Sequence, residues 1–426
     1  MAAKKKTKGK EATSAPNALM KARAAVTKVL KDDDPGIDVD NAALKKSRPY
    51  IPTGSIALDY LIGGRLNRNG IAPCPGWPKG GVSQIYGHES SGKTTVALMA
   101  AKAVCAAGGM VCFIDWEHAL DLSYARALGV PVDNPAKFYL TQPNTLEEGM
   151  KVLWACGAQG VDLIILDSIS AGVPQEIFGQ KLEDQGNIGR VGLQAAKWST
   201  FLPKVASLVS KTGSHVMGLS QLRKKINTSG YGGDGTTASG GEAWKFYAQV
   251  RMKFQRVQSE KGKVYSALSH KMEEQVVSSI IKAKIDKSKV SGSQQHTGTF
   301  YVVFGEGIDD LRTCIEVATA HGKVNKGGAW YTFERENGTT IKSQGLVAFK
   351  NDLLQAPGAI AEITKLAMTA LQAAGGTLPE IAEEDQDAID LAQIVDGIEV
   401  DMDALLADDG TNPPSDGDDE AADDGE

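Results

Sequence analysis

The sequence predicts an α/β protein with a mostly parallel central sheet, and two observations carry this prediction. Between residues 49 and 308, short apolar runs alternate with helical patterns, which is typical of strands joined by crossover helices. One of these runs leads directly into a glycine-rich motif at residues 87–94 that opens a helix. The chain has 426 residues, 42% hydrophobic and 23% charged, which indicates a globular protein with two or three domains.

The N-terminal stretch divides into two parts. Residues 1–15 are rich in lysine and lack apolar periodicity, so we expect a disordered basic leader. Within residues 16–48, apolar side chains recur at helical spacing from Leu19 to Leu30, and Asn17 is available as an N-cap. An amphipathic helix outside the main domain needs a partner for its apolar face, either its own core or a neighbouring subunit. Our prediction for 16–48 is a helical segment that serves oligomerisation.

The core is expected over residues 49–308. Its candidate strands are, in chain order, 82–86, 110–114, 161–166, 215–220, 248–254, 276–285 and 299–304. Stretches rich in glycine, proline or polar residues predict loops at 65–80, 178–190 and 225–241.

Two further parts follow the core. Residues 309–374 predict a small α/β C-terminal domain that ends in a helix, and residues 375–426 predict a disordered acidic tail. Residues 380–426 contain 19 acidic and no basic residues, so the rest of the chain holds all 46 Lys and Arg against 33 of the 52 acidic residues, a formal +13. This asymmetry suggests a polyanion-binding protein whose tail competes for its basic surface; a tail that only confers solubility is the alternative.

Several classes of protein are disfavoured by the composition. The chain lacks an apolar run of about 18 residues, so no membrane-spanning helix is predicted, and no signal-peptide core follows the basic start. We therefore expect a cytoplasmic protein with no membrane partner. The five cysteines are scattered and form no CxxC pair, which disfavours both a disulfide framework and a zinc site.

The glycine-rich motif GHESSGKT fits the phosphate-binding pattern G-x-x-x-x-G-K-[ST] in full. Its glycines let backbone N–H groups wrap around phosphates, and the helix that follows adds its dipole. We expect Lys93 to reach the β- and γ-phosphates of ATP and Thr94 to ligate Mg²⁺. The nucleotide-binding residues predicted from this segment are Gly87, His88, Glu89, Ser90, Ser91, Gly92, Lys93, Thr94 and Thr95.

Carboxylates at the ends of other predicted strands complete the chemistry. Asp167 follows the apolar run VDLIIL and is expected to give the second protein contact to Mg²⁺. Hydrolysis also needs a group that orients and polarises water, and the segment FIDWEHALD offers Glu117 as a general base. Asp115 is the competing candidate, and these residues alone leave the choice open.

Together these segments resemble the bacterial RecA family, of which the chain looks like a divergent member. The phosphate-binding motif at 87–94, or P-loop, is shared by many ATPases. The EHALD and KFYA blocks in this order are far more specific to the RecA family. The resemblance spans roughly residues 49–335. It is carried by IPTGSIALDYLIGG (51–64), GHESSGKTT (87–95), FIDWEHALD (113–121), YARALGV (124–130), ILDSISA (165–171), GGEAWKFYAQVR (240–251), FGEGI (304–308) and GAWY (328–331).

The resemblance implies a RecA-type P-loop ATPase core and a DNA-dependent ATPase that uses Mg²⁺. It further implies helical filaments on single-stranded DNA, homologous pairing with duplex DNA, and strand exchange in recombinational repair. Single-strand-binding and loading proteins would be additional partners. Among the residues, it assigns Glu117 as the base, and it matches Asp121 and Tyr124 to positions that hold adenine.

Communication between sites is also implied by the resemblance. Gln221 matches the glutamine that senses the γ-phosphate and passes the signal to a DNA-binding loop. Lys282 and Lys284 match lysines that contact ATP bound in the neighbouring subunit, and their alternation places both on one face of a strand.

Two stretches, about 178–192 and 223–241, match the DNA-binding loops of the family. Basic side chains, hydroxyls and backbone N–H groups there can contact phosphates without reading sequence. Val191 and Ile226 occupy places where an apolar side chain wedges between base triplets. The expected DNA-binding residues are Arg190, Val191, Lys197, Arg223, Lys225, Ile226, Thr237, Gly240 and Gly241.

Two other classes of function compete with the recombinase. A RecA-fold motor, such as a ring helicase or DNA-packaging ATPase, would share Lys93, Thr94 and Asp167 but should lack the EHALD and KFYAQVR context. A non-catalytic filament or mediator subunit would bind ATP as a structural ligand, which the intact set of Glu117, Lys93 and Asp167 disfavours.

Overall fold

The computed structural model describes residues 46–179, 190–224, 236–238, 241–266, 270–291, 296–373 and 376–379. The expected basic leader, almost all of the helical segment 16–48 and the acidic tail beyond residue 379 lie outside these residues. The described residues from Arg48 on belong to one compact unit.

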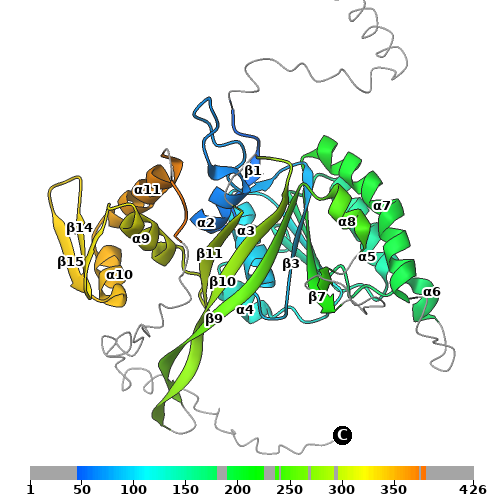
Figure 1. The fold of residues 1–426 in the computed structure, drawn as a ribbon. Coiled ribbons are helices and arrows are strands. Elements are labelled where there is room, and N and C mark those ends of the chain that lie inside the picture. Colours follow the sequence, from blue (N-terminus) through cyan, green and yellow to red (C-terminus); the bar gives the residue numbers. More distant parts are fainter. Residues whose placement is uncertain are drawn as a thin grey trace, which may run out of the picture. The chain divides into compact units, whose positions relative to one another are not determined.

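A ten-stranded sheet forms the centre of the fold (Figure 1). Its strands are β3 (Gly81–Gly87), β4 (Val111–Asp115), β5 (Phe138–Thr141), β6 (Leu163–Asp167), β7 (His215–Lys224), β8 (Thr236–Ala238), β9 (Val250–Ser266), β10 (Lys271–Ser288), β11 (Thr297–Val303) and β12 (Gly307–Ile308). The order is β12-β11-β10-β9-β3-β7-β6-β4-β5, and β8 pairs with β7. The six strands from β9 to β5 are parallel, and the other four are antiparallel to their neighbours.

Helices cover both faces of this sheet. They are α2 (Ile56–Asp59), the π-helix η2 (Tyr60–Gly64), α3 (Lys93–Ala106), α4 (Leu122–Ala127), α5 (Leu146–Ala158), α6 (Gln175–Phe178), α7 (Arg190–Thr212) and α8 (Glu242–Tyr247). Successive strand residues point to opposite faces, so Ile85 joins a core with α3, whereas Val82 joins one with α5, α7 and α8. A mostly parallel sheet with helices on both faces confirms the predicted α/β class.

Each strand expected from the sequence overlaps an observed one, namely β3, β4, β6, β7, β9, β10 and β11. The structure adds the short strands β5, β8 and β12, which were not expected (β8 lies inside the stretch 225–241 that was predicted to be a loop), and it continues β9 and β10 as a long hairpin beyond the expected limits at 254 and 276 (Figure 1). These additions lack a clear apolar alternation, the signal from which strands are inferred. The stretch 65–80 is a loop, as expected, apart from β2 (Trp77–Pro78), which pairs with β1 (Tyr50–Ile51).

The C-terminal segment adds a three-stranded antiparallel sheet and three helices. Its elements are α9 (Asp310–Ala320), β13 (Asn325–Gly327), β14 (Trp330–Glu334), β15 (Thr340–Gln344), α10 (Leu346–Gln355) and α11 (Ala359–Gln372). Ile315, Phe333 and Phe349 are fully buried in a core of its own. The helix expected at 357–374 corresponds to α11.

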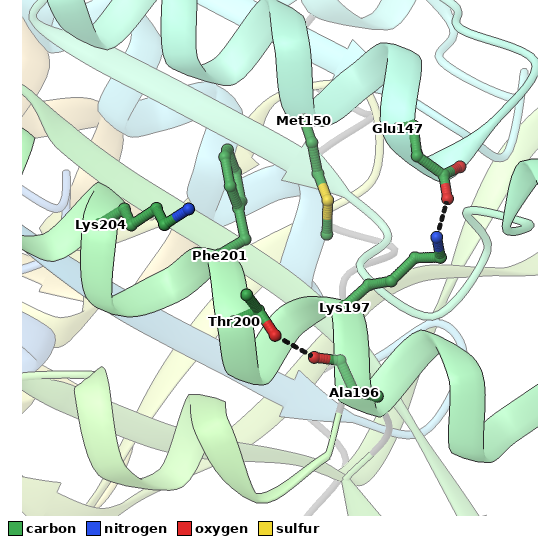
Figure 2. A pocket seen from close by; sticks show the side chains of 7 residues that line it. All are labelled: Glu147, Met150, Ala196, Lys197, Thr200, Phe201 and Lys204. Atoms are coloured by element: carbon green, nitrogen blue, oxygen red, sulfur yellow. Dashed lines mark hydrogen bonds and ion pairs between the residues drawn. The ribbon is translucent and has the colours of Figure 1, made fainter.

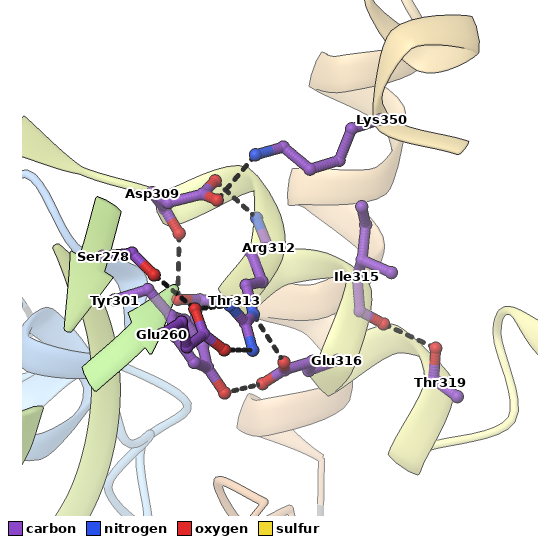
Figure 3. Close-up of polar contacts among 10 residues, drawn as sticks. All are labelled: Glu260, Ser278, Tyr301, Asp309, Arg312, Thr313, Ile315, Glu316, Thr319 and Lys350. Atoms are coloured by element: carbon purple, nitrogen blue, oxygen red, sulfur yellow. Dashed lines mark hydrogen bonds and ion pairs between the residues drawn. The ribbon is translucent and has the colours of Figure 1, made fainter. Parts of the chain in front are cut away.

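A buried ionic cluster ties this segment to the main sheet (Figure 3). Arg312 of α9 donates two hydrogen bonds to the Glu260 carboxylate on β9, at 2.8 and 3.0 Å. Its Nε donates to Glu316 at 3.1 Å, and its guanidinium lies 3.8 Å from the ring centre of Tyr301 on β11. One side chain therefore joins α9 to two strands of the sheet.

Among the described residues, no helix is both long and apolar enough to cross a membrane. All five cysteines lie in the described part of the chain, and all are free thiols.

Candidate active site

The phosphate-binding motif forms a tight loop between β3 and α3. Gly92 has a φ of 78° and ends the loop, and α3 begins at Lys93. Ser91 Oγ donates to the carbonyl oxygen of His88 at 2.7 Å, which closes the turn. At Gly87 a Cβ would lie 2.3 Å from the carbonyl oxygen of Phe254 on β9, so only glycine fits there.

Lys93 is buried inside this loop. Its Nζ donates to the carbonyl oxygens of His88 at 2.7 Å and Gly87 at 3.3 Å. Burial lowers the pKa of Lys93, and the nearby carboxylates of Asp167 and Glu117 oppose that shift. Carbonyl oxygens are uncharged, so they do not neutralise the buried ammonium group of Lys93, and its positive charge is available to an anionic ligand.

The two residues expected to hold Mg²⁺ lie side by side. Thr94 Oγ1 donates to Asp167 Oδ2 at 2.8 Å, which joins the first turn of α3 to the end of β6. Burial raises the pKa of Asp167 to about 6, although the Thr94 hydrogen bond lowers it. A hydroxyl and a buried carboxylate that lacks a full counter-charge are hard oxygen ligands that fit a divalent cation.

The structure separates the two candidates for the base. Asp115 accepts backbone N–H groups of Glu117, Ala119 and Leu120 at 3.0–3.1 Å and the side-chain amide of Gln142 at 3.0 Å, so its carboxylate holds the loop after β4. Glu117 is exposed, and its Oε1 accepts from Gln221 Nε2 at 3.2 Å. The geometry leaves Glu117, not Asp115, available for a water molecule. Sequence reasoning missed Gln142, because no local pattern marks a residue so far along the chain.

The pair expected to hold adenine lies beside the first turn of α3. The Tyr124 hydroxyl is 2.9 Å from Thr95 Oγ1. Asp121 is the N-cap of α4 and accepts the N–H groups of Ser123 and Tyr124 at 2.8 and 3.0 Å. Asp121 therefore fixes the helix that carries Tyr124.

Lys282 and Lys284 lie on the exposed face of β10, with Ile281 and Ala283 buried on the other. Lys284 Nζ is 3.7 Å from Asp286. The buried face is the one turned toward the phosphate loop, because a Cβ at Gly92 would lie 3.8 Å from Ile281. The structure thus directs both lysines away from the nucleotide loop of their own subunit.

The residues that flank the two expected DNA-binding loops lie close together, near the end of β7. Leu222–Lys224 pair with β8, which closes the base of the second loop. A Cβ at Gly241 would lie 2.9 Å from the Ala195 side chain on α7, close after the first loop. Arg190, Val191, Arg223 and Thr237 are described by their backbone only, and Lys225, Ile226 and Gly240 lie outside the described residues.

Lys197 is engaged with two carboxylates, of which Figure 2 shows Glu147. Its Nζ lies 2.6 Å from Glu147 and 2.7 Å from Glu176. Lys197 and Glu147 line one side of a pocket of about 340 Å³ between α5 and α7, whose other lining residues include Met150 and Phe201. Lys197 is therefore held within its own subunit rather than presented as a free cation.

Comparisons with known proteins identify the family to which the chain is similar. The model of the RecA N-terminal domain family matches residues 39–309. Protein RecA of Salinispora arenicola is 36% identical over 329 residues, 76% of this chain and 84% of that protein. Protein RecA of Frankia alni is 39% identical over 287 residues (67% and 74%), and that of Pseudarthrobacter chlorophenolicus is 35% identical over 350 residues (82% and 88%).

Among solved structures, the RadB recombinase matches 61% of this chain and 98% of its own, at 18% identity and a TM-score of 0.42. The family-model match and the curated relatives confirm the resemblance carried by the sequence motifs. This chain belongs to the RecA family.

Proposed function

We propose that the residues gathered around the phosphate loop perform the ATP hydrolysis of a recombinase that assembles on single-stranded DNA. As a RecA family member, the chain is a DNA-dependent ATPase that acts in homologous recombination and DNA repair. One observation carries the assignment of residues: Lys93, the Thr94–Asp167 pair and the Glu117–Gln221 pair converge at the ends of adjacent parallel strands.

Lys93, Thr94 and Asp167 bind the nucleotide. When bound, Mg²⁺–ATP supplies the bond to be hydrolysed and a metal charge that neutralises its phosphates. Thr94 and Asp167 hold the metal, and Lys93 exchanges its backbone carbonyl partners for phosphate oxygens. Tyr124, fixed by the Asp121 cap, offers a ring for the base to stack on.

Glu117 acts as the general base, and Gln221 controls its position. A carboxylate with one amide partner can accept a proton from water, whereas the Asp115 carboxylate is occupied by the loop it holds. Gln221 lies on β7, which runs directly into the second DNA loop. A change in that loop therefore reaches the base through a single residue.

DNA is held by the two loops, whose flanking residues lie close together beside β7. Contacts from Arg190, Arg223 and Lys225 go to phosphates, and Val191 and Ile226 wedge between base triplets. Thr237, Gly240 and Gly241 add backbone and hydroxyl donors. Lys197 contributes a phosphate contact only when it leaves its two carboxylates.

Assembly makes hydrolysis cooperative in this proposal. Lys282 and Lys284 project away from their own nucleotide loop and reach ATP in the neighbouring subunit of the filament. The residues 16–48 contribute to the same self-association. The filament then pairs with homologous duplex DNA in the cytoplasm, with single-strand-binding and loading proteins as further partners.

The test is phosphate release by the purified chain without DNA, with single-stranded DNA and with duplex DNA. We expect single strands to stimulate hydrolysis, and Glu117→Gln to lower the stimulated rate about 100-fold or more while ATP-dependent DNA binding persists. Glu334→Gln, the same change at an exposed carboxylate on β14, is the control and should leave the rate unchanged. Hydrolysis indifferent to DNA would favour a motor ATPase, and absent hydrolysis a non-catalytic filament subunit.

A further inference from the structure

Three strands meet behind the phosphate loop, and one buried side chain joins them. Gln84 lies on β3, shortly before Gly87, and is 1% exposed. Its Nε2 donates to Ser220 Oγ on β7 at 2.8 Å, and its Oε1 accepts from Arg251 Nε on β9 at 2.8 Å. The amide supplies both the donor and the acceptor that these contacts need without adding a charge.

The two strands joined by Gln84 are those that enter and leave the second DNA loop. β7 runs into residues 225–235, and after α8 the chain returns to the sheet as β9. Ser220 directly precedes Gln221, whose amide contacts Glu117. Gln84 therefore cross-links both flanks of that loop at the strand that carries the nucleotide loop.

Two further interactions relate the surroundings of Gln84 to α8. Arg251 is 9% exposed, its guanidinium lies 4.9 Å from the Tyr86 ring centre, and Glu242 at the start of α8 attracts it electrostatically. Trp244 fixes the same helix to β7, because its ring would lie 2.6 Å from a Cβ at Gly218. Motion of α8 is thus passed to the sheet through the Trp244 ring, and the charge of Glu242 acts on the guanidinium that Gln84 accepts from.

Stability is a weak reason for this arrangement. A buried arginine is costly to desolvate, and a buried ion or polar trio is often matched by apolar packing of the same volume. What a fully satisfied polar chain provides is a single fixed geometry. Here the fixed quantity is the register of β7 and β9 relative to β3, and hence the place of Gln221.

We propose that Gln84 is a positioning residue that couples the second DNA loop to the Glu117–Gln221 pair through Ser220 and Arg251. DNA bound at the loop shifts its two flanks, and Gln84 converts that shift into the hydrolytic position of Gln221. This inference rests on the proposed function, because it requires the loop to contact DNA. Hydrolysis without DNA does not depend on Gln84, whereas stimulation by DNA does.

The test compares Gln84→Met with Gln84→Glu in the full chain. Methionine has a similar size but no hydrogen bonds, so stimulation by single-stranded DNA should fall about 3- to 30-fold, the range of mutations along a coupling network. The DNA-free rate and the KM for ATP should stay within about twofold, below the smallest coupling change expected. Glutamate still accepts from Arg251, and the Ser220 hydroxyl can turn to donate to it, so Gln84→Glu should retain most of the stimulation.

Two further variants keep the test sharp. Ser83→Ala, on the opposite face of β3, is the matched control and should keep full stimulation. Ser220→Ala removes the hydrogen bond between Ser220 and Gln84 with little change in volume, so it provides the test if Gln84→Met folds poorly. Ser220→Ala should reduce stimulation by DNA. Combining it with Gln84→Met should have little further effect, because both substitutions break the same series of hydrogen bonds.

Several results would overturn the inference while the wild-type chain remains DNA-stimulated. They are full stimulation in Gln84→Met, an equal fall of its DNA-free and DNA-stimulated rates, no rescue by glutamate, or additive effects of the two substitutions. A wild-type rate that ignores DNA would overturn the proposed function as well, so the two failures are distinguishable.

Discussion

Replacing Arg312 with methionine tests how the C-terminal segment is fixed to the ATPase sheet. The substitution keeps the unbranched apolar stem but removes the guanidinium that joins Glu260, Glu316 and Tyr301 (Figure 3). Both partners in the main ion pair are shielded, since the side chains of Arg312 and Glu260 are 11% and 12% exposed. Burial alone would raise the pKa of Glu260, but the hydrogen bonds and charge of Arg312 outweigh it and lower that pKa.

The magnitude follows from what is left behind. Arg312→Met leaves the shielded Glu260 carboxylate without its cation and removes one partner of the partly exposed Glu316, and breaking a buried ion pair costs about 3–5 kcal/mol. The contact with the Tyr301 ring adds about 0.5–2 kcal/mol, part of which the thioether of methionine restores. We therefore expect the free energy of unfolding to fall by roughly 3–5 kcal/mol at neutral pH.

Urea unfolding followed by circular dichroism measures this loss. The matched control is Arg126→Met, because Arg126 also donates two hydrogen bonds to one carboxylate, that of Asp133, at 2.8 and 2.7 Å, but with side chains 54% and 73% exposed. The control should leave the urea midpoint unchanged within error. If Arg312→Met shifts the midpoint no more than Arg126→Met does, burial of the pair does not have the importance argued above.

Three other predictions follow from the structure. Burial raises the pKa of Asp59 from 3.8 to about 7, so the folded chain binds a proton there more tightly than the unfolded chain. The free energy of unfolding therefore falls as the pH rises from 3.8 to about 7. Asp59→Asn still accepts the Thr53 N–H, so urea midpoints between pH 4 and 8 should lose this decline. Tyr124→Ala should raise the KM for ATP about 5- to 100-fold through lost stacking, and Tyr124→Phe far less, in steady-state assays. Deletion of 380–426 should tighten duplex binding in anisotropy titrations at moderate salt, and an unchanged salt-dependent affinity would refute the competitor role.

Much of the nucleotide site could be predicted because its signals are local. The motif at 87–94 combines glycines, Lys93 and Thr94 in one short segment between a strand and a helix. Asp167 and the candidate bases Glu117 and Asp115 lie at the ends of apolar runs, so strand ends predict where these carboxylates lie but leave the choice of base open. The strands themselves were found where apolar residues dominate, as in β3 and β6, because burial on both faces leaves a continuous apolar run.

Long-range polar contacts were beyond reach of the same reasoning. Only the fold shows that Asp115 is occupied by the loop it caps, or that Lys197 lies between Glu147 and Glu176. Gln84 looks like one of two polar interruptions in an otherwise mostly apolar strand, and its partners lie more than a hundred residues away along the chain. The hairpin extension of β9 and β10 was missed because its strands are solvated and carry no alternation to detect.

The strand order has a consequence for how this chain is made. β3 emerges early in synthesis, yet both of its neighbours, β7 and β9, are much later in the sequence. Gly87 even packs against the backbone of Phe254, at the far side of the second DNA loop. A nascent chain that ends before β9 therefore exposes the unpaired edge of a strand that is fully buried in the finished fold, which is the kind of surface that aggregates or recruits chaperones. Nucleotide binding therefore becomes possible only late in synthesis, and ribosome-bound chains should begin to retain ATP only after residue 254 has emerged.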